Sequence, residues 1–198
     1  MEKRLDEIFR ERTIGDERFD ELKPNGPLME VVSGNLVYKG RALSLECGRG
    51  FDSLYLAQQG FAVAAVGFFP DAVAEVQRRA EEAKANITTY VVERYPFPFH
   101  EGEFDFVSDT TGCLLGLEGA DRAALVGELH RLLKVGGRMF LLLPSFTDNP
   151  GGFTRGGIDE AFHPPFEVIR VVETSMAGVG GPRPPGFTYF YAVLLEKR

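Results

Sequence analysis

An alternation of two hydrophobic periods between residues 41 and 144 constrains the fold more than any other feature of this sequence. Short apolar runs are separated by segments with helical periodicity, at residues 51–59, 71–84 and 120–133. The runs are ALSLEC, FAVAAVGFF, ITTYVV, FDFVSD and RMFLLLP. Such continuous apolar runs suit strands that helices cover on both faces, and the alternation is typical of parallel βαβ units. The sequence therefore predicts five parallel core strands.

Residues at the ends of the helical segments agree with this interpretation. Asp71 follows Pro70 in the first turn of the second segment, where a carboxylate suits the positive end of the helix dipole. Gly60 is expected to end the first helix, and Gly136-Gly137 the third, as left-handed caps.

Beyond Pro144 we expect a loop, a short helix at GIDEAF, and two strands at FEVIRVVET and FTYFYAVLLEKR. A segment of about a dozen residues rich in Gly and Pro joins these strands, which suits an antiparallel pair closing the sheet. LDEIFRER and GPLMEVVSG are expected to be helices. The sequence thus predicts one domain over 1–198: an N-terminal helical extension at 1–40 and a Rossmann-like, doubly wound core at 41–198, whose mostly parallel seven-stranded sheet has an antiparallel last strand.

Charge and cysteine content narrow the function. The net charge of −7 and pI near 5.1 argue against a nucleic-acid partner and favour a small-molecule substrate. Basic residues at 78–79 and 134–138 are expected to lie on solvated faces. Cys47 and Cys113 are expected to be reduced thiols. The charged start and the lack of a long apolar run indicate no leader peptide, no membrane partner and a cytoplasmic protein; the oligomeric state is open.

The most informative stretch is a strand, a Gly-rich turn and a helix opening at ALSLECGRGFDSLYLAQQG. Gly48 and Gly50 allow close approach of a ligand, and the amides that open the next helix can hold an anionic group. Two glycines in such a turn can also serve packing alone.

This stretch resembles the first motif of class I S-adenosylmethionine-dependent methyltransferases, Asp/Glu-x-Gly-x-Gly-x-Gly, which here reads Ser44-Leu45-Glu46-Cys47-Gly48-Arg49-Gly50. Later segments follow the family's order: VVERYPFPFHEGEFDFV, FDFVSDTTGCL and ELHRLLKVGGRMFLLL. Within the superfamily the sequence is most similar to small thiopurine- and tellurite-methyltransferase-like proteins. The resemblance implies S-adenosylmethionine as cofactor and a site made by Ser44, Glu46, Cys47, Gly48, Gly50, Gly67, Phe68, Glu93, Arg94, Asp109 and Thr110.

Within that site the resemblance implies two particular roles. Glu93 would contact the adenine amino group, and Asp109 would lie beside the methyl-transfer site as the catalytic residue. Asp109 could orient or deprotonate a nucleophile; alternatively it caps the turn after its strand.

Three departures from the family pattern fall in the cofactor half. Ser44 replaces the acidic residue of the motif, Glu46 replaces its first glycine, and Gly67 stands where a carboxylate usually grips the ribose hydroxyls. Two such hydrogen bonds are worth on the order of 3 kcal/mol together. Glu46 could clash with the cofactor's amino-acid end or form a salt bridge with its ammonium. Phe68 could stack on a purine or simply pack in the core.

Three functions are compatible with these residues. The first is methyl transfer to a small molecule, where positioning of the nucleophile supplies most of the catalysis. The second is a catalytically inactive binding or partner module, which the three departures motivate. The third is a nicotinamide-dependent enzyme, because residues 48–53 imitate G-x-G-x-x-G; Gly67 also lacks the acidic side chain that this fingerprint needs.

Other candidate residues are given structural roles. His100, His130 and His163 are widely spaced outside any metal-ligand motif, so no metal is predicted and each is expected on the surface or in a loop. Asp105 is expected to be structural. Loop aromatics at Phe19, Phe146, Phe153 and Phe187 could shape an apolar pocket or anchor their own loops.

Overall fold

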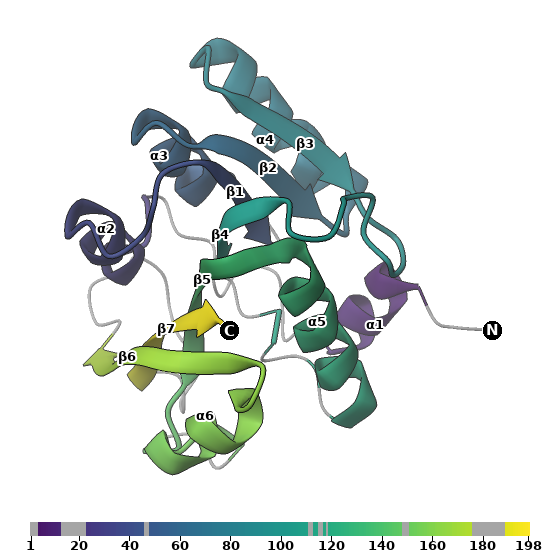
Figure 1. Ribbon diagram of the computed structural model, residues 1–198. Coiled ribbons are helices and arrows are strands. Elements are labelled where there is room, and N and C mark those ends of the chain that lie inside the picture. Colours follow the sequence, from purple (N-terminus) through teal and green to yellow (C-terminus); the bar gives the residue numbers. More distant parts are fainter. Residues whose placement is uncertain are drawn as a thin grey trace.

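The structure is a computed structural model that describes residues 4–12, 23–45, 48–110, 113–114, 117, 119–147, 151–175 and 189–198. Within these residues seven strands form one sheet in the order β3-β2-β1-β4-β5-β7-β6 (Figure 1). The strands are β1 (Arg41–Leu45), β2 (Ala62–Gly67), β3 (Ile87–Val91), β4 (Phe104–Asp109), β5 (Leu133–Pro144), β6 (Phe166–Ser175) and β7 (Tyr189–Lys197).

Strand directions confirm the predicted fold class. Parallel pairing joins β1 to β2, β1 to β4, β2 to β3 and β4 to β5. β7 is antiparallel to both β5 and β6. The sheet is therefore mostly parallel with an antiparallel last strand, and β6 runs in the same direction as the core strands. Its last residue, Ser175, pairs with the first residue of β7, Tyr189, at the carboxyl edge of the sheet.

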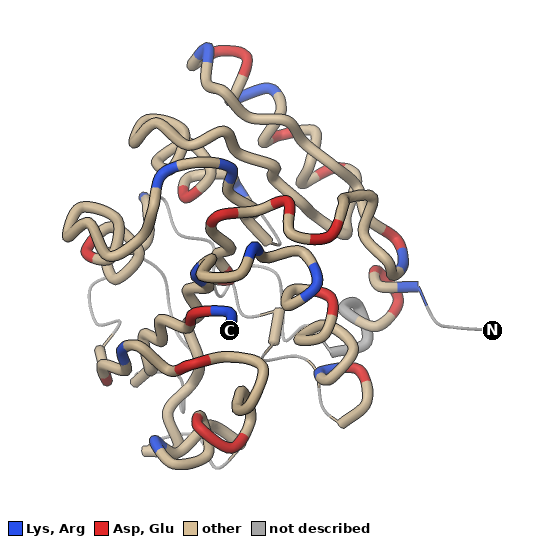
Figure 2. Tube along the Cα trace, viewed as in Figure 1, with Lys and Arg blue, Asp and Glu red and all other residues tan. Residues whose placement is uncertain are grey.

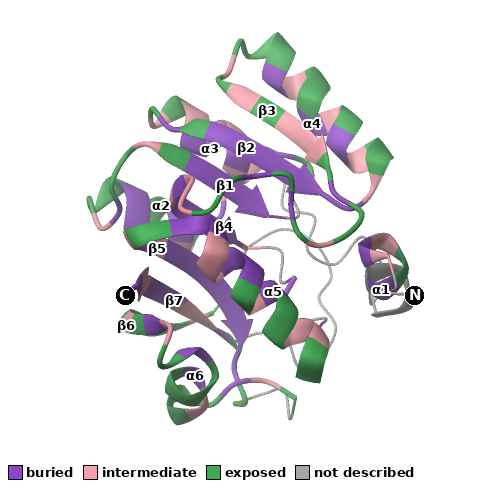
Figure 3. Cartoon of the chain, turned by 45° about the vertical axis from the view of Figure 1, so that its right-hand side comes forward, coloured by how far each residue is buried: buried purple, intermediate pink, exposed green. Residues whose placement is uncertain are grey.

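Helices cover both faces of this sheet because the central strands are mostly apolar and successive side chains point to opposite faces. Leu43 and Leu45 belong to the larger buried cluster, which also includes residues of α1, α5 and α6, whereas Ala42 belongs to the cluster that includes residues of α2 and α3. Figure 3 shows the buried central strands between helices whose outer faces are exposed. The helices are α1 (Leu5–Arg12), α2 (Gly26–Ser33), α3 (Phe51–Gln58), α4 (Pro70–Glu82), α5 (Gly119–Leu132) and α6 (Arg155–Phe162).

Most predicted element ends agree with the structure to within a few residues. Gly60 adopts the predicted left-handed conformation, with φ 93°, just after α3, and Asp71 lies in the first turn of α4. The prediction that Gly136-Gly137 end the third helix is wrong. Gly136 is left-handed, with φ 76°, but α5 ends at Leu132 and the next residue already pairs with Phe104 of β4. The glycine instead lies where the pairing between β4 and β5 shifts register.

The two N-terminal helices, α1 and α2, both pack against the core, but in different buried clusters. Leu5 and Ile8 of α1 are buried in the larger cluster, and Leu28, Val31 and Val32 of α2 in the smaller one. In the part of the chain that is described, no helix has the length and apolar character needed to cross a membrane.

Candidate functional site

The strand order reverses between β1 and β4, which are neighbours although two strands separate them in sequence. The helix after β1 packs on one face of the sheet, and the helix after β4 packs on the other. In open α/β sheets ligands bind at the carboxyl ends of the strands at such a point. The carboxyl ends of β1, β4 and their neighbours therefore form the candidate site.

The glycine turn lies at this point. Gly48 and Gly50 have left-handed φ values of 46° and 79°, and Gly50 directly precedes α3. A Cβ on Gly50 would lie 2.9 Å from Val76 of α4, so glycine is required here both by the backbone and by packing. The predicted site residues Glu46 and Cys47 lie outside the described residues.

Two serines face each other in the strands at the reversal point. Ser44 of β1 pairs in register with Ser108 of β4, and both are buried. They share the sheet face of Ala42 and Phe106, because side chains two residues apart point the same way. The hydroxyls of Ser108 and of Ser53, in the first turn of α3, are buried without a hydrogen-bond partner among the described residues. Buried hydroxyl groups in proteins usually have a hydrogen-bond partner.

A carboxylate that the sequence analysis did not single out connects three elements beside this turn. Asp52, in the first turn of α3, accepts a hydrogen bond from the hydroxyl of Thr110, just past β4, at 2.5 Å. It also accepts one from the backbone N–H of Asn25, the residue that caps α2, at 2.7 Å. Burial raises the pKa of Asp52, and these two hydrogen bonds offset only part of that effect. The sequence could have identified Asp52 as a site residue from its position two residues after the glycine turn.

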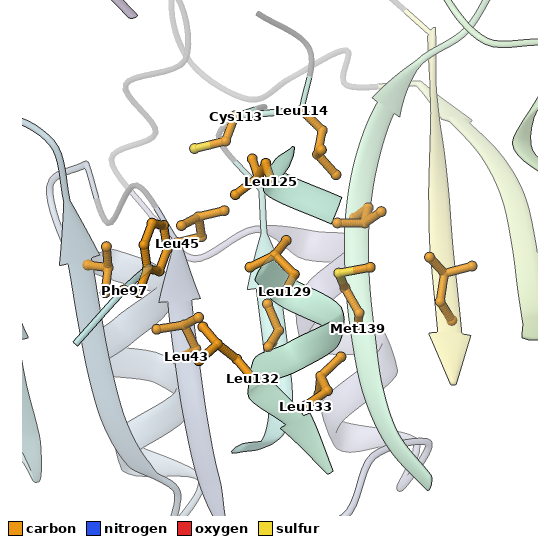
Figure 4. Close-up of a cluster of buried hydrophobic side chains, with 14 of the residues drawn as sticks. Leu43, Leu45, Phe97, Cys113, Leu114, Leu125, Leu129, Leu132, Leu133 and Met139 are labelled. Atoms are coloured by element: carbon orange, nitrogen blue, oxygen red, sulfur yellow. The ribbon is translucent and has the colours of Figure 1, made fainter. Parts of the chain in front are cut away.

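Asp109, the predicted catalytic residue, caps the turn that follows β4. Its two carboxylate oxygens accept hydrogen bonds from the N–H groups of Cys113, at 3.0 Å, and Leu114, at 3.1 Å. The side chain is only 1% exposed. Figure 4 places Cys113 and Leu114 at one end of the buried cluster, beyond Leu45 and Leu125. This geometry favours the capping role that the sequence left open for Asp109.

The end of β2 offers little to a ligand. Gly67 is buried, and its carbonyl accepts a hydrogen bond from the N–H of Val92 at 3.0 Å. Phe68 is 1% exposed and belongs to the larger buried cluster. Its ring therefore has no free face for a purine, which supports the packing role rather than stacking.

Glu93 projects from the end of β3 and is tied to the N-terminal helix. Its carboxylate accepts a hydrogen bond from the Arg4 guanidinium at 2.8 Å, and its backbone carbonyl accepts one from the N–H of Leu5 at 2.8 Å. The Glu93 side chain is 52% exposed, and Arg94 is exposed as well. Both predicted residues thus lie at the carboxyl edge, and Figure 1 shows α1 beside the end of β3.

A second group missed by the sequence analysis holds the loop between β3 and β4. The Glu128 carboxylate of α5 accepts from the N–H of Phe97 at 2.6 Å and pairs with Arg131 at 2.7 Å. Arg131 in turn donates to the carbonyl of Phe99 at 3.0 Å. These contacts fix the course of the chain after Glu93. Their residues lie far apart in sequence, so no local pattern predicts them.

The opposite edge of the sheet has a different aspartate. Asp105 accepts from the N–H of Arg41 at 2.8 Å and pairs with Lys134 at 2.7 Å, which confirms its predicted structural role.

Figure 2 shows basic and acidic residues interspersed along α4, where Glu75 pairs with Arg78 and Arg79.

Several secondary predictions can also be placed. His100 and His163 are exposed, and His130 is half-buried on α5 with its ring against Phe166. Cys113 is buried and forms no disulfide with a described residue. Phe153 is buried and Phe146 exposed. Phe19 and Phe187 lie outside the described residues. No group of residues able to hold a metal ion occurs in the described part.

Comparison with known proteins identifies the same segment. Residues 42–137 match the model of a family described as a methyltransferase domain. An uncharacterized methyltransferase from Synechocystis sp. is 33% identical over 124 residues, which are 62% of this chain and 52% of that protein. The chain thus spans about half the length of this curated relative. The matched segment contains the glycine turn, Gly67, Glu93, Asp109 and α5.

Solved structures share the fold at low sequence identity. A protein whose structure concerns the conversion of a disulfide bond into a thioacetal group during echinomycin biosynthesis is 20% identical, with TM-score 0.76 and coverage of 91% of this chain and 84% of that chain. A Burkholderia thailandensis 1,6-didemethyltoxoflavin-N1-methyltransferase is 20% identical, with TM-score 0.68 and coverage of 87% and 77%. TehB from Haemophilus influenzae is 17% identical, with TM-score 0.68 and coverage of 88% and 62%.

These comparisons match the central segment to a methyltransferase domain and show a Rossmann-like fold shared with solved methyltransferases, in agreement with the resemblance seen in the sequence. The cofactor predicted from the sequence is S-adenosylmethionine. The residues present fit such a ligand in part. The turn at 48–50 and the unpartnered hydroxyls of Ser53 and Ser108 suit its amino-acid end, whereas Gly67 provides no side chain for its ribose.

Proposed function

We propose that this chain transfers a methyl group from S-adenosylmethionine to a small-molecule acceptor. The observation that supports the proposal most strongly is the left-handed turn at Gly48–Gly50, which opens α3 at the point where the strand order reverses. The family match over residues 42–137 includes this turn. A ligand at the turn would lie between the elements that Asp52 and Thr110 join.

The chain's own residues have distinct parts in this proposal. The amides around Gly48 and Gly50 receive the carboxylate of the donor's amino-acid end. Glu93 accepts from the adenine amino group. Asp109 acts as a positioning residue, because its carboxylate fixes the turn at 113–114 beside the methyl-transfer site. When bound, S-adenosylmethionine supplies a methyl group that a correctly placed nucleophile attacks directly, so placement does most of the catalytic work.

Two considerations support a small-molecule acceptor. The net charge of −7 disfavours a phosphate backbone as the partner. The crystal structure of the structurally similar Burkholderia thailandensis enzyme contains bound 1,6-didemethyltoxoflavin and S-adenosylhomocysteine. We therefore propose an acceptor of comparable size for this chain, but we do not assign that particular compound to it.

A second candidate function is a catalytically inactive binding module with weakened or lost cofactor binding. It is favoured by the absence of a side chain at Gly67 and by the pairing of Glu93 with Arg4, which engages the carboxylate expected to contact adenine.

Isothermal titration calorimetry with S-adenosylmethionine and S-adenosylhomocysteine distinguishes the two candidates. The methyltransferase proposal predicts saturable binding of both ligands with micromolar dissociation constants. Folded protein that shows no binding at millimolar ligand would contradict it and leave the inactive module. Thermal unfolding in the same buffer verifies that the protein tested is folded.

A further inference from the structure

Asp52 is a half-buried carboxylate with no cationic partner among the described residues, unlike three other carboxylates that pair with a cation. Glu128 pairs with Arg131, Asp105 with Lys134 and Glu196 with Arg138. Asp52 has only its two neutral donors, the Thr110 hydroxyl and the Asn25 N–H, among the described residues. A carboxylate removed from water is costly unless it is paired. A cationic group of a bound ligand would compensate this carboxylate.

The position of Asp52 indicates which ligand this is. The residue lies two positions after Gly50, in the first turn of the helix that the glycine turn opens. Through Thr110 it contacts the end of β4, and through Asn25 it contacts the start of α2. Asp52 therefore lies among the elements that meet at the reversal of strand order, where the proposed cofactor would place its amino-acid end.

The carboxylate retains the capacity to accept further hydrogen bonds. An ionised carboxylate offers about four lone-pair positions, and the two donors use one position on each oxygen. An ammonium group has three N–H donors to offer. The buried hydroxyls of Ser53 and Ser108, which lack partners among the described residues, belong to the same first turn and to the strand that leads to Thr110. They are additional acceptors for such a group.

We propose that Asp52 holds the ammonium group of the cofactor's amino-acid end and so replaces the acidic residue that the family has at the position of Ser44. This inference rests on the proposed function, since it assigns a residue to the site of the methyl donor. The carboxylate has moved from the end of β1 to the first turn of α3. Asp52 thereby makes the site selective for ligands that retain the amino-acid end.

Two ligands that differ in that end test the proposal. S-adenosylhomocysteine has the ammonium group, and 5′-methylthioadenosine lacks the whole amino-acid end. Dissociation constants for both are measured by calorimetry on the full chain and on Asp52→Asn. Asp71→Asn is the matched control, because Asp71 also lies in the first turn of a helix after a core strand but is exposed.

Asp52→Asn is expected to weaken S-adenosylhomocysteine binding by about tenfold or more, the value of one charge-assisted hydrogen bond, and to change 5′-methylthioadenosine binding by less than about twofold. Asp71→Asn should change neither. Unaltered S-adenosylhomocysteine binding in Asp52→Asn, or equal weakening of both ligands, would overturn the proposal, since the second result indicates a purely structural connection between α2, α3 and β4.

Two further variants keep the test decisive if Asp52→Asn does not fold. Asp52→Glu retains the charge and Asp52→Ser removes it, so the ratio of the two dissociation constants should be closer to wild type in Asp52→Glu. Equal ratios in these variants contradict the proposal. Wild-type protein that binds neither ligand defeats the proposed function itself, whereas binding that is insensitive to residue 52 defeats only this inference.

Discussion

The two edges of the sheet are each held together by an aspartate, but the electrostatic surroundings of the two aspartates are opposite. At the amino edge Asp105 joins β1 to β4 and pairs with Lys134. At the carboxyl edge Asp52 joins α3 to α2 and to the end of β4 with no cation among the described residues. Burial alone would raise the pKa of Asp105, yet Lys134 and the Arg41 N–H outweigh it and lower that pKa. The pKa of Asp52 is raised.

This difference separates a stabilising arrangement from a site. At the amino edge Asp105 is compensated by Lys134, and its side chain packs so closely that a Cβ on Gly40 would lie 2.2 Å from its carboxylate oxygen. Among the described residues, the carboxyl edge instead retains a carboxylate without a cationic partner and the buried hydroxyls of Ser53 and Ser108 without a hydrogen-bond partner. Functional sites commonly have such unfavourable features, because a ligand rather than the protein completes them.

The largest effect is expected for Gly50→Ala at the carboxyl edge. Its left-handed φ of 79° and the Val76 contact at 2.9 Å should together cost about 3 kcal/mol of unfolding free energy. Gly60→Ala is the matched control, since Gly60 has φ 93° but nothing within 4 Å of a Cβ, and should cost about 1 kcal/mol. Urea denaturation measures both. Equal losses would show that the turn is not packed tightly against α4.

A smaller effect is expected for Asp105→Asn at the amino edge. Removal of the Lys134 pair should cost about 1 kcal/mol near neutral pH. Because the folded-state pKa of Asp105 is lowered, its stabilisation is present above the unfolded pKa of about 4 and is lost as the pH falls through the folded value. Unfolding midpoints of wild type and variant should therefore converge in acid. A constant difference down to pH 2 would contradict this assignment.

Asp52→Asn should have a still smaller effect on stability, and one of opposite sign. A raised folded-state pKa means that the ionised carboxylate disfavours folding, so this penalty is absent below the unfolded pKa of about 4 and appears as the pH rises through the folded value. The variant should match or exceed wild type by up to about 1 kcal/mol at pH 7. A loss at pH 7 as large as that of Asp105→Asn would remove the contrast between the two edges.

The smallest effect is expected for Arg4→Ala at the end of β3. The Arg4–Glu93 pair is exposed, with side chains 39% and 52% accessible, so the denaturation midpoint should stay within experimental error. S-adenosylhomocysteine affinity should rise slightly, by less than about threefold, because Glu93 becomes free to accept from adenine. Calorimetry on Arg4→Ala and Arg4→Lys measures this change. Weaker binding in Arg4→Ala would indicate that α1 helps to form the site.

The sequence predicted the architecture well and the site only in part. Short apolar runs separated by helical segments determine which segments are buried strands, so the strands were predicted from the sequence. The turn was predicted from the glycines at 48 and 50. Contacts between distant segments were not. The link from Asp52 to Thr110 spans 58 residues, and that from Glu128 to Phe97 spans 31. Asp109 and Phe68 had two possible roles each, and only burial and hydrogen bonding favour one of them.

A titration of 15N-labelled protein with S-adenosylhomocysteine, followed in 1H–15N correlation spectra, tests most directly whether the carboxyl edge is the ligand site. The account predicts that the amide resonances of residues 48–53 and 108–110 shift on binding, while those of Gly40, Arg41 and Asp105 at the amino edge stay unchanged. Spectra that do not respond to saturating ligand, or shifts confined to the amino edge, would contradict it.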